Sequence, residues 1–120
     1  MDAVLIADDD LLLRMVLRTA LERRGFAVEE AADGDAMLRL LGSRRYSLCL
    51  MDAGMPGPAL EDRCEWLRTT APDLPVVMLT GQADVPCRTQ CPDMRYASKP
   101  IDLGALDALL ADAGLIGGQG

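Results

Sequence analysis

Carboxylate, hydroxyl and ammonium side chains stand at the carboxyl-terminal ends of short apolar runs in this sequence. They are Asp8, Asp9 and Asp10 after the first run, Asp52 after the third, Thr80 after the fourth and Lys99 after the fifth. Each residue alone has an ordinary explanation, such as a helix cap or a solvated turn. If the runs are strands of one parallel sheet, however, all these side chains lie on one rim, and their joint placement indicates a single site.

Carboxylates that converge on one point need a proton or a cation. Two unit charges about 4 Å apart repel by roughly 4 kcal/mol at an effective dielectric of 20. Mg²⁺ is a hard cation that typically binds one or two carboxylates and keeps several waters, and Lys99 offers a second, fixed positive charge. Such a site attracts a phosphoryl group, toward which Asp52 can act as a nucleophile.

The elements that must position these residues alternate along the chain. Short, mostly apolar runs predict strands at Ala3–Ala7, Ala27–Ala31, Ser47–Met51, Pro75–Leu79 and Arg95–Ser98. Helical spacing predicts helices at Leu11–Arg24, Asp35–Leu41, Leu60–Thr70 and Leu103–Ala113. This alternation predicts an α/β fold in which a parallel sheet is covered by helices on both faces.

Composition excludes several classes of function. The 120 residues include no histidine, so Ser–His and Cys–His triads, zinc sites with histidine ligands and a phosphohistidine are impossible in this chain. A formal net charge of −7 without a basic stretch disfavours direct nucleic-acid binding. No apolar run approaches the roughly 20 residues of a membrane helix. We expect a cytoplasmic protein.

The four cysteines are Cys49, Cys64, Cys87 and Cys91. The first two stand in apolar or helical patterns, where a thiol usually acts as a small hydrophobic group. The other two lack a second cysteine pair or a histidine that would complete a metal set. We expect free thiols.

The chain resembles a response-regulator receiver domain, the CheY-like module of bacterial two-component signalling, over essentially its whole length. The resemblance is carried by VLIADDD, LCLMDAGMPG, PVVMLTG and YASKP, in that order. It implies a doubly wound, five-stranded parallel sheet of flavodoxin-like strand order 2-1-3-4-5. It further implies a phospho-accepting signalling domain rather than an enzyme, with Mg²⁺ as cofactor and a histidine kinase or histidine phosphotransfer domain as partner.

Within this resemblance, Asp52 matches the phosphoacceptor. Asp8 and Asp9 match the acidic pair that holds Mg²⁺, directly or through water, and the backbone carbonyl of Gly54 matches a further ligand. Asp10 competes with the acidic pair for this role, but its position directly before a helix favours capping.

The remaining matches concern the conformational switch. Thr80 matches the hydroxyl that engages the phosphoryl group, and Lys99 the lysine that pairs with its oxygen. Tyr96 matches the aromatic residue that turns inward when the threonine moves, although an ordinary half-buried tyrosine is the alternative. The Lys99–Pro100 bond resembles the family's cis peptide.

The sequence departs from the family at Gln82–Met94, which contains Pro86 and Pro92 and has no clean apolar stripe. Because proline inside a helix costs about 3 kcal/mol or more, we expect the fourth helix to be short, distorted or absent. Partner recognition is then expected at the first helix and the loops beside it. The domain is predicted to span residues 1–116, with a flexible tail at 117–120.

Three hypotheses remain open. The first is a phosphorylation-controlled receiver domain, which is either free-standing or part of a hybrid kinase or larger regulator. A protein-binding scaffold would need no acceptor chemistry, yet the acids, the threonine and the lysine are all present. A hydrolase with an aspartyl-phosphate intermediate would need a second acid two residues beyond its nucleophile, where this chain has Gly54.

Overall fold

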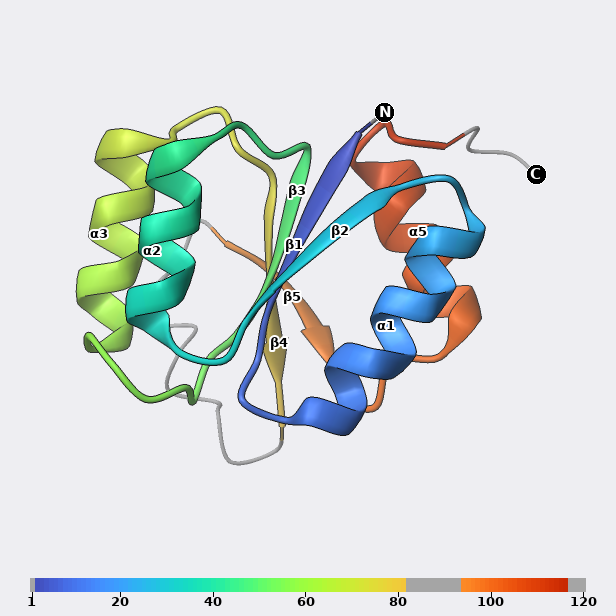
Figure 1. Cartoon of the computed structure of the whole chain (residues 1–120), viewed down its shortest axis with the longest axis horizontal. Coiled ribbons are helices and arrows are strands. Elements are labelled where there is room, and N and C mark those ends of the chain that lie inside the picture. The colour runs from blue at the N-terminus through green and yellow to red at the C-terminus, as the bar shows by residue number, and fades with distance from the viewer. Residues whose placement is uncertain (1, 82–93, 117–120) are drawn as a thin grey trace.

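The computed structural model describes residues 2–81 and 94–116, which form a parallel sheet with helices on both faces (Figure 1). The strands are β1 (Ala3–Ala7), β2 (Ala27–Ala31), β3 (Leu48–Asp52), β4 (Val76–Thr80) and β5 (Arg95–Ser98). The helices are α1 (Leu11–Arg23), α2 (Gly34–Ser43), α3 (Leu60–Thr70) and α5 (Leu103–Asp112). The strands pair in parallel in the order β2-β1-β3-β4-β5, which confirms the predicted fold and strand order.

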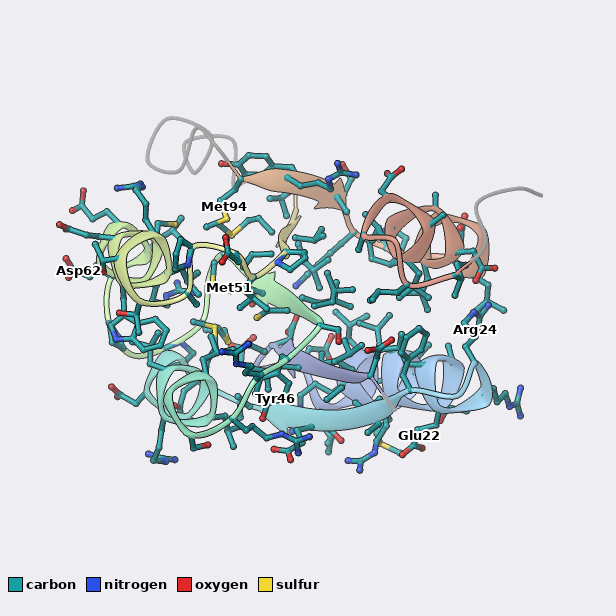
Figure 2. The ribbon with its side chains drawn as sticks, turned by 90° about the horizontal axis from the view of Figure 1, so that it is seen from above. Glu22, Arg24, Tyr46, Met51, Asp62 and Met94 are labelled. Carbon is teal, nitrogen blue, oxygen red and sulfur yellow. The ribbon has the colours of Figure 1, made fainter. Side chains whose placement is uncertain are left out.

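Alternate residues of each strand supply two separate cores. Val4 and Ile6 of β1 pack with α1 and α5, whereas Leu5 and Ala7 pack with α2 and α3. This division follows from the two-residue period of a strand, and burial on both faces explains why the strands are almost continuously apolar. Figure 2, seen from above, shows side chains filling the space between the sheet and the helices on either side.

The ends of β3 and β4 differ from the prediction by one residue. Asp52 and Thr80 are the last residues of their strands, where Asp52 pairs with Leu79 and Thr80 with Ser98. The strands continue past the apolar residues because a neighbouring backbone is available for pairing, which hydrophobicity alone does not reveal. The backbones of both residues are therefore fixed by pairing between strands and do not belong to a loop.

Two predictions concern residues outside the described part of the chain. The expected short, distorted or absent fourth helix falls on residues 82–93, and no described residue bears it out. The expected flexible tail falls on residues 117–120. Among the described helices, none combines the length and apolar character that a membrane crossing requires.

The expectation of free cysteines holds at Cys49 and is wrong at Cys64. Cys49 is a buried free thiol in β3, and burial raises its pKa to about 12. Cys64 in α3 is disulfide-bonded. Disulfide pairing depends on which segments meet in space, and spacing along the sequence does not reveal that. The positions Cys87 and Cys91 lie outside the described residues.

Candidate metal-binding site

Three carboxylates gather at the carboxyl ends of β1 and β3, which are neighbours in the sheet. Asp8, Asp9 and Asp52 each offer one oxygen, and these atoms lie within 4.8 Å of one another. Asp8 is 0% exposed and Asp52 is buried, whereas Asp9 is exposed. The acidic cluster therefore lies at the edge of the sheet, with two of its acids buried and Asp9 exposed to solvent.

The two oxygens of Asp8 have different surroundings. Oδ1 accepts a hydrogen bond from the backbone N–H of Asp10 at 2.9 Å. Oδ2 is buried and receives no aligned hydrogen bond, although Nζ of Lys99 lies 2.9 Å away, so that contact is an ion pair only. A buried carboxylate oxygen with unused lone pairs is a suitable ligand for a hard cation. The residues present therefore fit Mg²⁺.

Lys99 joins the two buried acids. Its ammonium lies 2.9 Å from Asp8 Oδ2 and 3.1 Å from Asp52 Oδ1. It follows β5 and precedes a cis bond to Pro100, as the resemblance implied. Burial works against the charged ammonium, but its interactions with the carboxylates of Asp8 and Asp52 outweigh this effect and raise the pKa of Lys99. One ammonium thus contacts two of the three clustered carboxylates, and no salt bridge among the described residues involves Asp9.

Thr80 and Tyr96 lie on the adjacent strands β4 and β5. The buried Thr80 hydroxyl donates to the carbonyl of Ala97 at 3.4 Å, while the Thr80 carbonyl accepts from the backbone N–H of Lys99 at 2.8 Å. Tyr96 is partly buried against the core that α2 and α3 form with the sheet. Gly54 is exposed, and a Cβ atom there would meet nothing within 4 Å. The backbone at Gly54 is therefore uncrowded.

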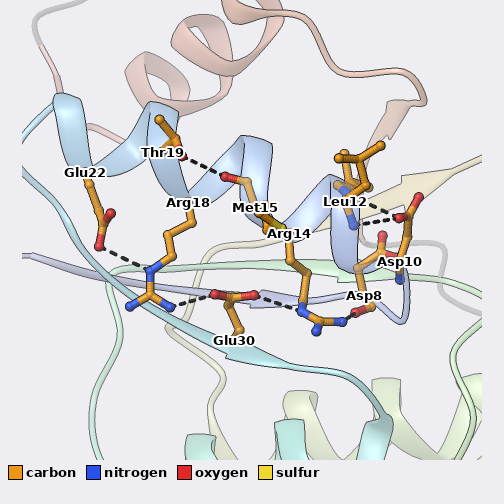
Figure 3. Close-up of polar contacts among 10 residues, drawn as sticks. Asp8, Asp10, Leu12, Arg14, Met15, Arg18, Thr19, Glu22 and Glu30 are labelled. Atoms are coloured by element: carbon orange, nitrogen blue, oxygen red, sulfur yellow. Dashed lines mark hydrogen bonds and ion pairs between the residues drawn. The ribbon is translucent and has the colours of Figure 1, made fainter.

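Asp10 serves as a helix cap. Its side chain accepts hydrogen bonds from the backbone N–H groups of Leu12 and Leu13 at 3.0 and 3.2 Å, at the start of α1 (Figure 3). It satisfies donors that have no partner inside the helix. The capping prediction is confirmed, and Asp10 is not among the three clustered acids.

A charged network supports Asp8 from α1 and β2 (Figure 3). Arg14 donates from Nη1 to the Asp8 carbonyl at 2.8 Å and from Nε to Glu30 at 2.9 Å. Arg18 binds the other oxygen of Glu30 at 2.6 Å. Burial acts against ionised Glu30, but hydrogen bonds from Arg18 and Arg14 outweigh it and lower its pKa. Sequence reasoning missed this network; an acidic residue inside a mostly apolar strand was the available signal.

The loop between β3 and α3 depends on glycine at position 57. Gly57 has φ +114°, and an added Cβ would lie 3.1 Å from the backbone nitrogen of Gly34. Gly57→Ala is therefore expected to lower the free energy of unfolding by about 2 kcal/mol. Urea denaturation measures the loss. Gly54→Ala, where the added Cβ meets no atom, is the control and should change stability by less than about 0.5 kcal/mol; equal losses would contradict the prediction.

The sequence matches the family described as response regulator receiver domain over residues 4–111. Over 111 residues it is 37% identical to response regulator MprA of Mycolicibacterium vanbaalenii and 36% identical to response regulator MprA of Mycobacterium avium. These alignments cover 90% of this chain but 47% of each relative. The chain therefore spans about half the length of the curated relatives it matches.

Solved structures share the fold. A response regulator receiver domain protein of Clostridium thermocellum matches with a TM-score of 0.85 and 21% identity, covering 94% of both chains. Response regulator TrrA of Thermotoga maritima, solved with magnesium and beryllofluoride, matches with a TM-score of 0.84 and 22% identity, covering 94% of this chain and 99% of its own. The chain belongs to the response regulator receiver domain family, the CheY-like signalling modules of two-component systems, and is not a catalytic enzyme.

Proposed function

We propose that Asp52 accepts a phosphoryl group from a phosphohistidine on a histidine kinase or a histidine phosphotransfer domain, with Mg²⁺ held by Asp8, Asp9 and Asp52. The observation that carries this proposal is the gathering of three carboxylate oxygens within 4.8 Å, two of whose residues share the ammonium of Lys99. The structure of TrrA with magnesium and beryllofluoride supports it by analogy of fold. The domain would act in the cytoplasm.

In the proposed transfer, a carboxylate oxygen of Asp52 bonds to phosphorus while the phosphorus–nitrogen bond of the donor breaks. The departing imidazole nitrogen keeps the electron pair and takes up a proton. Bound Mg²⁺ supplies neutralisation of the phosphoryl oxygens, where such transition states accumulate charge. Lys99 pairs with a phosphoryl oxygen, and the carbonyl of Gly54 adds a ligand from the loop after β3. Attack of water on phosphorus later breaks the bond to the Asp52 oxygen, releases inorganic phosphate and returns Asp52 to its free carboxylate.

The switch proposed for the phosphorylated state starts at Thr80. Its hydrogen bond to the Ala97 carbonyl, at 3.4 Å, is longer than is usual for a hydroxyl donor, so little is lost when it is exchanged for a bond to a phosphoryl oxygen. As Thr80 moves, the ring of Tyr96 fills the vacated space and changes the surface beside β5. The phosphoryl group thereby shifts the balance between two conformations and controls a partner or an attached output domain.

The partner is proposed to dock on α1. Large apolar side chains are exposed in its first turns, with Leu12 at 69%, Met15 at 54% and Val16 at 50%. Together with Leu103 of α5, these side chains line a hollow of about 400 Å³. An exposed apolar patch marks an interaction site. It begins directly after Asp10, so a helical donor seated there would bring its phosphohistidine close to Asp52.

Met15→Glu is expected to slow phosphotransfer from a kinase that phosphorylates the unmodified domain by at least about tenfold, because it places a charge in a desolvated contact. Phosphorylation by acetyl phosphate should be unchanged, since this donor needs no docking surface. Thr70→Glu, which adds the same charge at an exposed position of α3, is the control. Equal slowing with both donors would contradict docking on α1.

The proposed function is tested by intact mass after incubation with acetyl phosphate and Mg²⁺. We expect a gain of one phosphoryl group that disappears when Mg²⁺ is chelated. Absence of the gain with any small phosphodonor would leave the scaffold alternative. Sustained release of phosphate from unrelated monoesters would favour the hydrolase alternative.

A further inference from the structure

Arg63 is a buried cation behind the acceptor site. It stands in the first turns of α3, and 1% of its surface is exposed. No carboxylate of the described residues lies within ion-pair distance of its guanidinium. A buried charge without an ionic partner is costly unless its donors are hydrogen-bonded. The hydrogen bonds of Arg63 therefore indicate why an arginine stands in this core.

The three side-chain hydrogen bonds that Arg63 makes to described residues end at the last residue of β3 or in the loop that follows it. Nη1 donates to the carbonyl of Asp52 at 3.0 Å, and Nη2 to the carbonyl of Ala53 at 2.9 Å. Nε donates to the carbonyl of Pro58 at 3.2 Å. These acceptors bracket the loop that runs from β3 to α3. One planar, rigid group thus holds both ends of the segment that carries the phosphoacceptor and Gly54.

The same loop is tied to α2 beside Arg63. The Pro56 carbonyl accepts from the backbone N–H of Gly34 at 2.8 Å. A Cβ atom added at Gly34 would lie 3.2 Å from Cδ of Arg63 and 3.1 Å from Cδ of Pro58. The arginine stem, the loop and the start of α2 are therefore packed closely, with little room for the guanidinium to move.

Arg63 also interacts with Asp52 through its charge. Burial lowers the pKa of Arg63, while the charge of Asp52 opposes that shift. The guanidinium lies behind a group of three carboxylates that Lys99 only partly neutralises. Arg63 is therefore coupled to the site by geometry and by charge, without touching any reacting atom.

We propose that Arg63 is a positioning residue, whose three hydrogen bonds hold the backbone at Asp52 and the loop after it in the geometry that binds Mg²⁺. This inference rests on the proposed function, because it concerns the same metal site. It assigns the effect to the forked shape of arginine. Lysine, which carries the charge on a single nitrogen, cannot reproduce the three bonds.

The test measures Mg²⁺ binding alone, by calorimetry, in the full chain and in Arg63→Lys and Arg63→Met. Both variants are expected to bind Mg²⁺ about 10- to 100-fold more weakly, as is usual when a residue that orients a metal ligand is lost. Leu67→Ala removes another buried side chain of α3 and should destabilise the fold while keeping the affinity within about twofold. Restored affinity in Arg63→Lys, or equal weakening in Leu67→Ala, overturns the proposal.

A second measurement needs no variant. In the unmodified chain, the guanidinium N–H signals of Arg63 should exchange slowly with water and shift when Mg²⁺ and beryllofluoride are added. The signals of Arg68, exposed on the same helix, should do neither. Exchange at Arg63 as fast as at Arg68 overturns the proposal. If the unmodified chain fails to bind Mg²⁺, the proposed function fails; if it binds Mg²⁺ and only the Arg63 results disagree, this inference alone fails.

Discussion

Asp52→Asn is expected to abolish the gain of one phosphoryl group from acetyl phosphate in the presence of Mg²⁺. The amide is nearly the same size as the carboxylate but has no anionic oxygen to attack phosphorus. Its carbonyl oxygen can still accept from Lys99, which lies 3.1 Å from Asp52 Oδ1, so the local packing should remain. Intact mass reports the modification, and urea denaturation confirms that the variant is folded.

Asp62→Asn is the matched control for Asp52→Asn. Asp62 is an exposed acid of α3, outside the carboxylate cluster. It should leave both the extent and the rate of phosphorylation unchanged. A folded Asp52→Asn protein that still gains a phosphoryl group at the normal rate would contradict the assignment of the acceptor.

The positions of the acids could be predicted because they depend on local sequence. Each follows an apolar run long enough for one strand, and parallel strands bring their carboxyl ends to one edge. Asp8 and Asp52 are 44 positions apart in the sequence, yet they lie at the carboxyl ends of neighbouring strands and share one ammonium. Strand order itself came from the resemblance to receiver domains, since apolar runs do not state which strands are neighbours.

The supporting arginines could not be predicted in the same way. Arg63 lies on the buried side of α3 with Cys64 and Leu67, where a hydrophobicity pattern expects an apolar residue. Its acceptors are backbone carbonyls, which every sequence has, so no partner residue marks the contact. Arg14 is similar, because one of its two partners is the carbonyl of Asp8. Helix periodicity predicts which residues face inward, but not that a charged residue will be satisfied there.

Asp8→Asn is expected to stabilise the metal-free fold while it weakens Mg²⁺ binding by 100-fold or more. Asp8 is 0% exposed, and its Oδ2 has no aligned hydrogen bond. Neutralising it removes repulsion within the cluster and the burial of a charge, and it leaves the Lys99–Asp52 pair in place. We expect a gain of about 1–2 kcal/mol, below the roughly 4 kcal/mol of an uncompensated pair, because the Lys99 contact to Asp8 is also lost.

Adding Mg²⁺ should make the unmodified chain more stable than Asp8→Asn. A ligand that binds only the folded state at 100 times its Kd stabilises that state by about 2.7 kcal/mol. The unmodified chain gains this amount, whereas Asp8→Asn gains almost none at the same concentration. Urea denaturation in chelator and in Mg²⁺ should therefore give opposite rankings. Asp10→Asn keeps the helix cap in the same loop and should follow the unmodified chain under both conditions. A lower stability of Asp8→Asn in chelator would contradict the prediction. The contacts of the Asp8 carboxylate with the protein would then outweigh the repulsion within the cluster.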